Sequence, residues 1–355
     1  MIDAHLVAER PPFRLDLRIR LAAGEVVAVT GPPGAGKTTA LRVLAGLTPP
    51  GGGHIVLDGA AVHARPPGVR PVGMLSPEHL LFPHLSALGN VAFGPRCRGA
   101  SRAEARRAAA LWLRRLGLGG RLRARPRELT PGEARLVALA RTLAVRPRVL
   151  LLDEPLAALD AGARLTVRAA LRAQLGVFDG GCVLVTGDPL DLALADRVLV
   201  VEGGALVQEG TPAEVACRPR TGFAARLAGL NLCRGDGRGR EVSVGPAGGP
   251  VLGVADEAKG PVYVAFPPSA VTLRPRPPDA AAGRWEAVVA GVEPHGDQVR
   301  VRLAGPIAAA ADLAPPAAVE LGLSPGLRVW AVTDAARTRA YPLDDTQPDI
   351  PAFWD

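Results

Sequence analysis

A short glycine-rich segment ends in a lysine and two threonines, side chains that are suited to binding a phosphate and its metal. Its residues are Gly31, Pro32, Pro33, Gly34, Ala35, Gly36, Lys37, Thr38 and Thr39. Small residues let the backbone bend around an anion so that several N–H groups point at phosphate oxygens. Lys37 would neutralise the outer phosphates, and the Thr38 hydroxyl would bind magnesium. An ordinary glycine turn is the alternative. Lys259 is the only other lysine of the chain, so chance is a poor explanation of this spacing.

Two neighbouring carboxylates form a second candidate site. Asp153 and Glu154 directly follow the apolar run Val149–Leu152. A continuously apolar strand is typical of a parallel sheet buried on both faces, and such sheets bind ligands at their carboxyl ends. Asp153 is therefore placed to hold magnesium through water, and Glu154 to orient an attacking water. A strand that ends in a solvated turn would explain one acid, but it explains the pair poorly beside a phosphate loop.

The flanking segments are those that would position these residues. The apolar run Val26–Val29 predicts a strand before the glycine segment, and Phe13–Leu21 alternates as a half-buried antiparallel strand does. Phe13 could stack on an adenine, although a place in the core is the more common fate of such a residue. Helix caps are indicated by Ser101 with Glu104, and by Thr130 with Glu133. Further strands around residues 183–186, 198–201 and 205–209 complete an alternating α/β pattern to about residue 230.

The remainder of the chain has a different composition. Glycine and charged residues dominate residues 233–260, which predicts a linker or loose loop after a domain of residues 1–232. Short apolar runs between Pro and Gly turns predict a small all-β barrel over residues 261–345, followed by a tail of residues 346–355.

Composition excludes several classes of protein. The net charge of +8 and the pI of about 10.2 come almost entirely from arginine, and no basic tract carries interleaved aromatic residues. This favours a compositional bias over a nucleic-acid interface. Four cysteines without a Cys-x-x-Cys pair indicate reduced thiols in a cytosolic protein. No apolar run approaches the ~18 residues of a membrane-spanning helix, and the first ten residues do not have the pattern of a signal peptide.

With these motifs in place, the first 230 residues resemble the ATP-binding subunit of an ABC transporter. The segments that carry the resemblance are the phosphate loop, a mobile segment near Phe82–His84, the signature Leu129–Glu133, the Asp153–Glu154 strand end and the loop Ala158–Asp160. The resemblance implies a P-loop NTPase core with an antiparallel β subdomain and an α-helical subdomain at about residues 78–145. It also implies that ATP and Mg2+ bind, with Thr38 and Asp153 at the metal and Glu154 as the catalytic residue. Thr130, Gly132 and Glu133 would contact ATP across a dimer, and Asp160 would lie in the D-loop.

The C-terminal β unit resembles the TOBE-like, oxyanion-binding modules of importer ATPases. Two patterns, Gly229–Leu232 and Phe266–Leu273, look most like ATPases of molybdate importers. The resemblance therefore implies a peripheral subunit at the cytoplasmic face of the membrane that energises import of molybdate or a related oxyanion. It would pair with itself or a related subunit, with permease subunits and, indirectly, with an extracytoplasmic binding protein. A DNA-associated member would need coiled-coil or zinc insertions, which the sequence lacks.

Three places depart from the family pattern. Pro77 stands where the mobile segment carries Gln, and the neighbouring Glu78 would be a substitute magnesium ligand. In the signature, Pro131 and Glu133 stand where the family has Gly and Gln. Gly187 replaces the His whose side chain contacts the γ-phosphate. Loss of one transition-state hydrogen-bond donor typically slows a reaction by roughly 10²- to 10³-fold. A subunit that clamps on ATP with little hydrolysis is therefore the alternative function.

Overall fold

The computed structural model describes residues 2–10, 13–78, 80–246, 248–278 and 283–343. The chain divides into two compact units, residues 1–212 and 213–355, which are described separately. The boundary thus lies at residue 212 instead of the expected 232. No helix among the described residues is long and apolar enough to cross a membrane.

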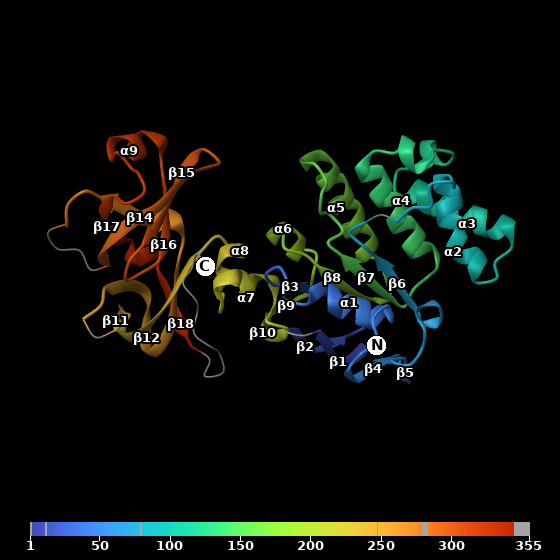
Figure 1. Ribbon diagram of the computed structural model, residues 1–355, viewed down its shortest axis with the longest axis horizontal. Helices are drawn as coiled ribbons and strands as arrows, with labels where there is room; N and C mark the ends of the chain where they lie inside the picture. The colour runs from blue at the N-terminus through green and yellow to red at the C-terminus, as the bar shows by residue number, and fades with distance from the viewer. Residues whose placement is uncertain (1, 11–12, 79, 247, 279–282, 344–355) are drawn as a thin grey trace. The chain divides into compact units, whose positions relative to one another are not determined.

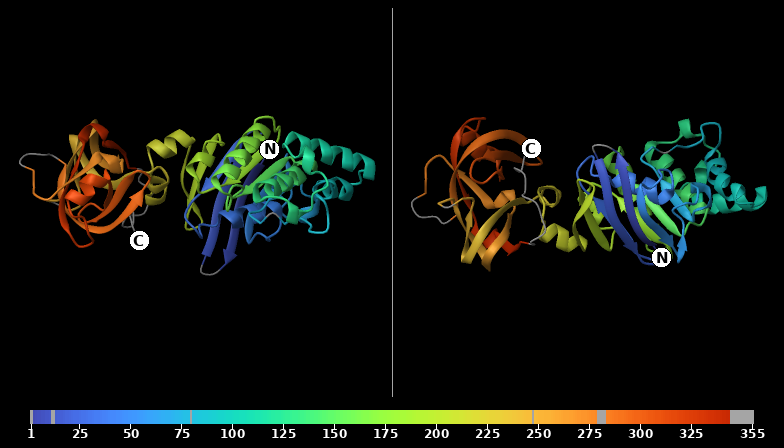
Figure 2. Two further views of the ribbon diagram at one scale, coloured as in Figure 1. Left: turned by 90° about the horizontal axis from the view of Figure 1, so that it is seen from above. Right: turned by 60° about the horizontal axis from the view of Figure 1, so that its bottom comes forward.

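The first unit is built on one mixed sheet (Figure 1). Across the sheet its strands are β5 (Ala60–Ala61), β4 (Gly52–Leu57), β1 (Ile2–Arg10), β2 (Phe13–Leu21), β10 (Ala205–Gly210), β9 (Arg197–Glu202), β3 (Val26–Thr30), β8 (Gly181–Val185), β7 (Val149–Asp153) and β6 (Val72–Leu75). The last five are parallel. At the other side β1 pairs antiparallel with β2 and β4, and Figure 2 shows β1 and β2 as long neighbouring strands. The expected antiparallel strand Phe13–Leu21 is confirmed, and every second residue of it from Leu15 is buried.

Side chains of the parallel strands enter two separate cores. In β7, Val149 and Leu151 belong to the core beneath the antiparallel strands, whereas Leu150 and Leu152 belong to the core on the opposite side. All five residues of β7 are buried, because both faces of the sheet are covered. This confirms the reading of Val149–Leu152 as a fully buried strand and leaves Asp153 at its carboxyl end.

Helices cover both faces of the sheet (Figure 1). They are α1 (Lys37–Ala45), α2 (Ala87–Cys97), α3 (Arg102–Arg115), α4 (Pro131–Ala144), α5 (Ala161–Leu175) and α6 (Pro189–Leu192), with 3-10 turns η1 (Pro67–Val69), η2 (Gly119–Arg121) and η3 (Pro126–Glu128). Helix α1 contributes to the first core, and α2 to α5 contribute to the second. Both expected caps are confirmed: Ser101 with Glu104 and Thr130 with Glu133 each form a capping box. Helices α2 to α4 contact one another and form a helical group within the expected range 78–145.

The second unit contains two antiparallel sheets around a shared core. One consists of β11 (Asn231–Val244), β12 (Val251–Phe266) and β18 (Arg339–Pro342). The other consists of β13 (Val271–Arg274), β17 (Arg328–Thr333), β14 (Arg284–His295), β15 (Gln298–Ala304) and β16 (Ala309–Leu313). The helical turns are α7 (Pro212–Cys217), α8 (Gly222–Leu227), α9 (Pro315–Glu320), η4 (Pro268–Ala270) and η5 (Ala335–Arg337).

The linker expected at residues 233–260 is wrong, because most of that segment lies in the paired strands β11 and β12. Asn231, in the pattern Gly229–Leu232, is buried and joins the two sheets: its side-chain amide donates to the Ala310 carbonyl at 2.9 Å and accepts from the Ala310 N–H at 2.7 Å. The expected tail, residues 346–355, lies outside the described residues.

Candidate nucleotide-binding site

The glycine segment forms a tight loop between β3 and α1, and two of its glycines are required by close contacts. A Cβ on Gly31, where φ is 156°, would lie 1.9 Å from the carbonyl oxygen of Val201. A Cβ on Gly36, where φ is 98°, would lie 2.6 Å from the ring of Phe13. The loop therefore brings its backbone against β9 and under Phe13. Because α1 begins at Lys37, the N–H groups of its first turn are available to an anion.

Lys37 spans this loop from the inside. Its Nζ donates to the carbonyls of Gly31 at 2.7 Å and Pro32 at 2.9 Å. Burial lowers the pKa of Lys37, and the carboxylates of Glu154 and Asp153 oppose that shift. Lys37 also lines a cavity of about 240 Å³ together with Phe13, Thr38 and Glu154. The cationic side chain, the loop and one of the two acids therefore share one cleft.

Asp153 lies at this cleft with one carboxylate oxygen unused by the described residues. It is buried, its Oδ1 accepts a hydrogen bond from the Thr38 hydroxyl at 3.1 Å, and its Oδ2 has no partner among the described residues. Burial raises the pKa of Asp153, while the bond from Thr38 and the charge of Lys37 lower it. An unpaired carboxylate oxygen beside a hydroxyl fits Mg2+, which prefers hard oxygen ligands and takes most of its coordination from phosphate and water. No group of three or more His, Cys, Asp and Glu in the described part of the chain has the arrangement of a metal site.

Glu154 stands between two cavities. It lines the phosphate-loop cavity and also a second cavity of about 430 Å³ that is bounded by Thr186–Pro189 and Arg164. Its backbone is left-handed, with φ of 44°, a conformation that costs a non-glycine residue about 1–2 kcal/mol. Its N–H donates to the Val185 carbonyl at 3.0 Å, which ties it to β8. The sharp turn after β7 thus directs Asp153 toward Thr38 while Glu154 faces open space.

The signature residues lie at the start of α4. Thr130 caps the helix, and the Glu133 carboxylate accepts from the Thr130 N–H at 2.9 Å. The same carboxylate accepts from Arg121 Nε at 2.8 Å. The bond to the Thr130 backbone is the main reason that the pKa of Glu133 is lowered, and Arg121 adds to the effect. The carboxylate at this position is therefore ionised and partly neutralised.

Gly132 and Asp160 have local structural roles in this single chain. A Cβ on Gly132 would lie 3.0 Å from that of Ala163, so glycine lets α4 approach α5 closely. Asp160 caps α5 by accepting from the Ala163 N–H at 2.9 Å. Neither residue lines the two cavities next to Glu154.

Pro77 contributes its carbonyl to a contact that sequence reasoning missed. Arg135, on α4, is almost fully buried, and its guanidinium donates to the carbonyls of Ser76 at 2.8 Å and Pro77 at 2.7 Å. It thereby fastens the loop after β6 to the signature helix. Glu78 is exposed and does not line either cavity. No local signal in the sequence identifies Arg135, because its partners lie almost 60 residues away.

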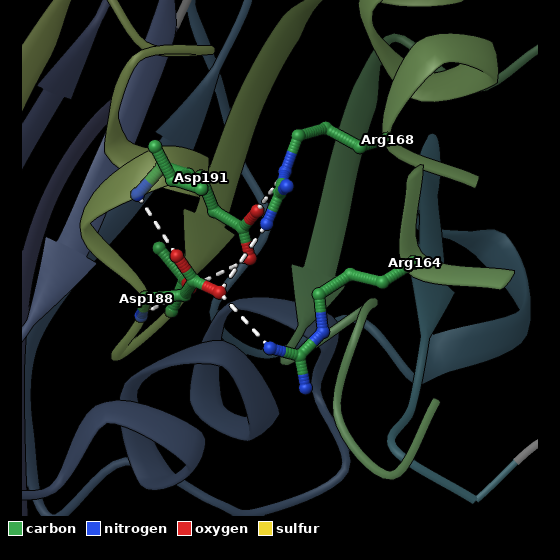
Figure 3. A network of polar contacts seen from close by, with 6 residues as sticks. Arg164, Arg168, Asp188 and Asp191 are labelled. Atoms are coloured by element: carbon green, nitrogen blue, oxygen red, sulfur yellow. Dashed lines mark hydrogen bonds and ion pairs between the residues drawn. The ribbon is translucent and has the colours of Figure 1, made fainter. Parts of the chain in front are cut away.

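The loop at Gly187 is held by a network of ion pairs (Figure 3). Arg168 Nε lies 2.7 Å from Asp191, and Arg168 Nη2 lies 3.2 Å from Asp188. Arg164 Nη1 lies 3.3 Å from the same Asp188 oxygen. The Thr186 hydroxyl bonds to Asp191 at 3.1 Å and accepts from the Asp188 N–H at 3.0 Å. Two arginines of α5 therefore fix the loop in which Gly187 provides no side chain.

Known proteins resemble the chain along nearly its whole length. Residues 15–157 match the ABC transporter family and residues 279–340 match the TOBE domain. The chain is 42% identical to the molybdenum import ATP-binding protein ModC of Mycobacterium tuberculosis, over 95% of this chain and 96% of that protein. It is 45% identical to the Fe(3+) ions import ATP-binding protein FbpC of Streptomyces coelicolor, over 61% of this chain and 62% of that protein.

Solved structures support the fold of the first unit. A dimeric ATP-binding cassette in a post-hydrolysis state with ADP and Pi aligns with a TM-score of 0.53 and 24% identity, over 60% of this chain and 99% of that one. The core that surrounds the phosphate loop is therefore a P-loop NTPase fold of the ABC type. Because the relative from Mycobacterium tuberculosis is 42% identical over nearly the full length of both proteins, this chain belongs to the family of ABC transporter ATP-binding subunits.

Proposed function

We propose that the chain binds Mg2+ and ATP at the loop between β3 and α1 and hydrolyses ATP to energise import of molybdate or a related oxyanion. The observation that carries the proposal is the convergence of Lys37, Thr38, the unpaired Asp153 oxygen and Glu154 at one edge of the parallel sheet. A terminal phosphate needs a cation, a metal ligand and a group that orients water, and these residues offer all three.

Different residues of the chain would bind the phosphates, hold Mg2+ and orient the attacking water. The N–H groups at the start of α1 and the Lys37 ammonium bind the phosphates, while Thr38 and Asp153 would hold Mg2+, which neutralises charge on the β- and γ-phosphates. Lys37 must exchange its present carbonyl partners for phosphate oxygens, and its partial burial makes the charge effective. Glu154 accepts a hydrogen bond from the attacking water and orients it toward the γ-phosphorus.

A dimer is part of the proposal. Thr130, Gly132 and Glu133 lie at the N-terminus of α4, where unpaired N–H groups and the helix dipole attract the γ-phosphate held by a second subunit. That second subunit is either another copy of this chain or a related ATP-binding subunit. Opening after hydrolysis would move attached permease subunits at the cytoplasmic face of the membrane, and an extracytoplasmic binding protein would deliver the cargo to them.

Thermal unfolding tests the nucleotide site. At an ATP concentration 100 times the dissociation constant, Mg2+ and ATP should stabilise the first unit by about 2.7 kcal/mol, which corresponds to a rise of roughly 5–10 °C in its Tm. The Lys37→Ala variant should show no such rise. Equal nucleotide-dependent shifts for both proteins would refute the phosphate-loop assignment.

The ATP clamp remains the second candidate, and the absence of a side chain at Gly187 favours it. Steady-state release of phosphate by the natural chain and by Glu154→Gln separates the two. A rate that falls at least tenfold on substitution supports the ATPase. Identical rates near background support the clamp.

Cellular metal content tests the cargo. Disrupting the gene in its native host should lower intracellular molybdenum when external molybdate is scarce, and the natural gene, but not the Lys37→Ala variant, should restore it. A fall in iron with unchanged molybdenum would favour ferric import instead, the function named for the relative from Streptomyces coelicolor.

A further inference from the structure

The second cavity next to Glu154 has a gap in its wall at Gly187. A Cβ built on Gly187 would meet no atom within 4 Å, so the loop after β8 leaves open space there. Among the described residues that line this cavity, Arg164 is the only one with a cationic side chain. Because Glu154 lines both cavities, a nucleotide whose terminal phosphate lies at Glu154 is adjacent to this one as well.

Arg164 has donors to spare. Its Nη1 shares one Asp188 oxygen with Arg168, and its Nε is buried without a partner among the described residues. Arg168 differs, since both its Nε and its Nη2 are paired with carboxylates (Figure 3). The Arg164 side chain is also the more exposed of the two, at 39% compared with 13%. Nη2 of this partly exposed guanidinium has no acceptor among the described residues, so a ligand oxygen in the cavity can accept from it without displacing a protein partner.

We propose that Arg164 is a γ-phosphate-binding residue of this site and supplies the hydrogen-bond donor that Gly187 cannot. The inference rests on the proposed binding of ATP by the phosphate loop. A guanidinium suits the role because it stays charged and presents several donors in one plane to phosphate oxygens. Asp188 holds it at the cavity without using all its donors.

Selective loss of affinity for the γ-phosphate tests the inference. Calorimetry on the full chain with Mg2+ would compare a non-hydrolysable ATP analogue with ADP. Since a hydrogen bond to a charged group is involved, Arg164→Ala should weaken binding of the analogue by about tenfold or more and leave ADP binding within about twofold. Arg172→Ala, an exposed arginine two turns further along α5 that does not line this cavity, should change neither.

A second substitution separates phosphate binding from support of the loop. The space at Gly187 accommodates a side chain, so Gly187→His should provide a donor that can replace Arg164 at the same phosphate oxygen. In that background Arg164→Ala should cost much less analogue affinity than in the natural chain. Arg168→Ala, which removes a structural ion pair, should have the same effect in both backgrounds. An equal loss for Arg164→Ala in both backgrounds would overturn the proposal and leave Arg164 as a loop anchor.

The same binding measurements separate a failure of the Arg164 proposal from a failure of ATP binding at the phosphate loop. If the natural chain binds the analogue through Lys37 but Arg164→Ala leaves the ratio of the two affinities unchanged, the inference alone is refuted. If neither nucleotide binds the natural chain, both fail. Thermal unfolding of each variant without nucleotide identifies a loss that comes from misfolding, and Arg164→Lys, which retains the charge, should then recover part of the analogue affinity.

Discussion

Replacing Asp153 by Asn should stabilise the nucleotide-free protein at neutral pH and, at the same time, remove its response to Mg2+. In the natural chain one carboxylate oxygen accepts from Thr38 while the other is buried without a partner. Burial is the largest influence on the pKa of Asp153, and it raises that pKa in spite of Thr38 and Lys37. The ionised side chain is thus unfavourable for folding of the nucleotide-free protein.

The expected gain in the free energy of unfolding is the difference between the cost of an unpaired carboxylate oxygen in Asp153 and that of an unpaired neutral amide in Asn. A buried polar atom without a partner costs about 1–3 kcal/mol, and a charged atom costs more than a neutral one. Asn keeps an acceptor for Thr38 and replaces the charged oxygen with a neutral amide, so a gain of roughly 1 kcal/mol is expected. For a unit of this size that corresponds to a rise of about 2–4 °C in Tm.

The raised pKa of Asp153 also predicts how the stability difference between Asp153→Asn and the natural chain changes with pH. An acid whose pKa is raised by folding favours the folded state below its unfolded pKa, and that advantage is lost as pH rises through the folded pKa. The advantage of Asp153→Asn over the natural chain should therefore appear as pH increases through the raised pKa of Asp153. At lower pH both side chains are neutral, and the difference should vanish.

Urea unfolding from pH 4 to 8, with and without Mg2+ and ATP, measures both effects. Thr38→Val is the matched control: it also weakens the metal site, but it removes the donor to Asp153 and should destabilise the protein without nucleotide. If Asp153→Asn instead lost 1 kcal/mol or more at pH 7, the ionised carboxylate would be favourable for folding, and the reasoning from the unpaired oxygen would be wrong.

Three further substitutions test the surroundings of the site. Arg135→Met should destabilise the first unit by about 2 kcal/mol in urea, because the Ser76 and Pro77 carbonyls lose their buried donor; unchanged stability would show that the contact is dispensable. Arg121→Ala should weaken ATP-induced dimerisation, measured by sedimentation, in the natural chain but not in a Glu133→Gln background, since only the carboxylate needs neutralising. Phe13→Ala should weaken ATP about tenfold and inorganic triphosphate much less, because only a base can stack on the ring; equal losses would assign Phe13 to the core.

Local patterns predicted the elements that carry the site. The strand Phe13–Leu21, the buried strand before Asp153 and the cap at Thr130 follow from alternation, apolar runs and capping residues, and each is present. The strand Ile2–Arg10 was not predicted, although its buried residues Ile2, Ala4, Leu6 and Ala8 alternate with more exposed ones. Alternation of small with large apolar residues is a weak signal until the partner strand is known.

The predicted linker shows where composition misleads. Strand β11 carries glycines at positions where other backbone or side-chain atoms lie very close. A Cβ on Gly235 would come within 2.5 Å of the carbonyl oxygen of Ser243, which lies further along β11 itself, and one on Gly237 within 2.7 Å of the Cβ of Ala258 on the partner strand β12. The pairing also shifts register between Gly239 and Glu241. Such glycines look like flexible loop residues in the sequence, but close approach of the backbones requires them here.

The long-range arginine contacts around the site could not be predicted from local sequence patterns either. Arg135 with Pro77, and Arg164 with Asp188, are separated by 58 and 24 residues. The chain contains many arginines, so composition does not single out either one. Only the fold, which brings α4 against the loop after β6 and α5 against the loop after β8, identifies them.

These contacts rank the departures from the family pattern. At Glu133 the carboxylate is bound by Arg121 and by the helix N-terminus, so we expect a small effect on ATP affinity. At Pro77 the backbone is held by Arg135, although no side chain replaces the missing amide. At Gly187 the loop is rigidly held, yet the cavity beside Glu154 keeps an open space. The donor missing at Gly187 is the one we assign to Arg164, so Gly187→His should accelerate hydrolysis by the Arg164→Ala variant more than Glu133→Gln or Pro77→Gln does.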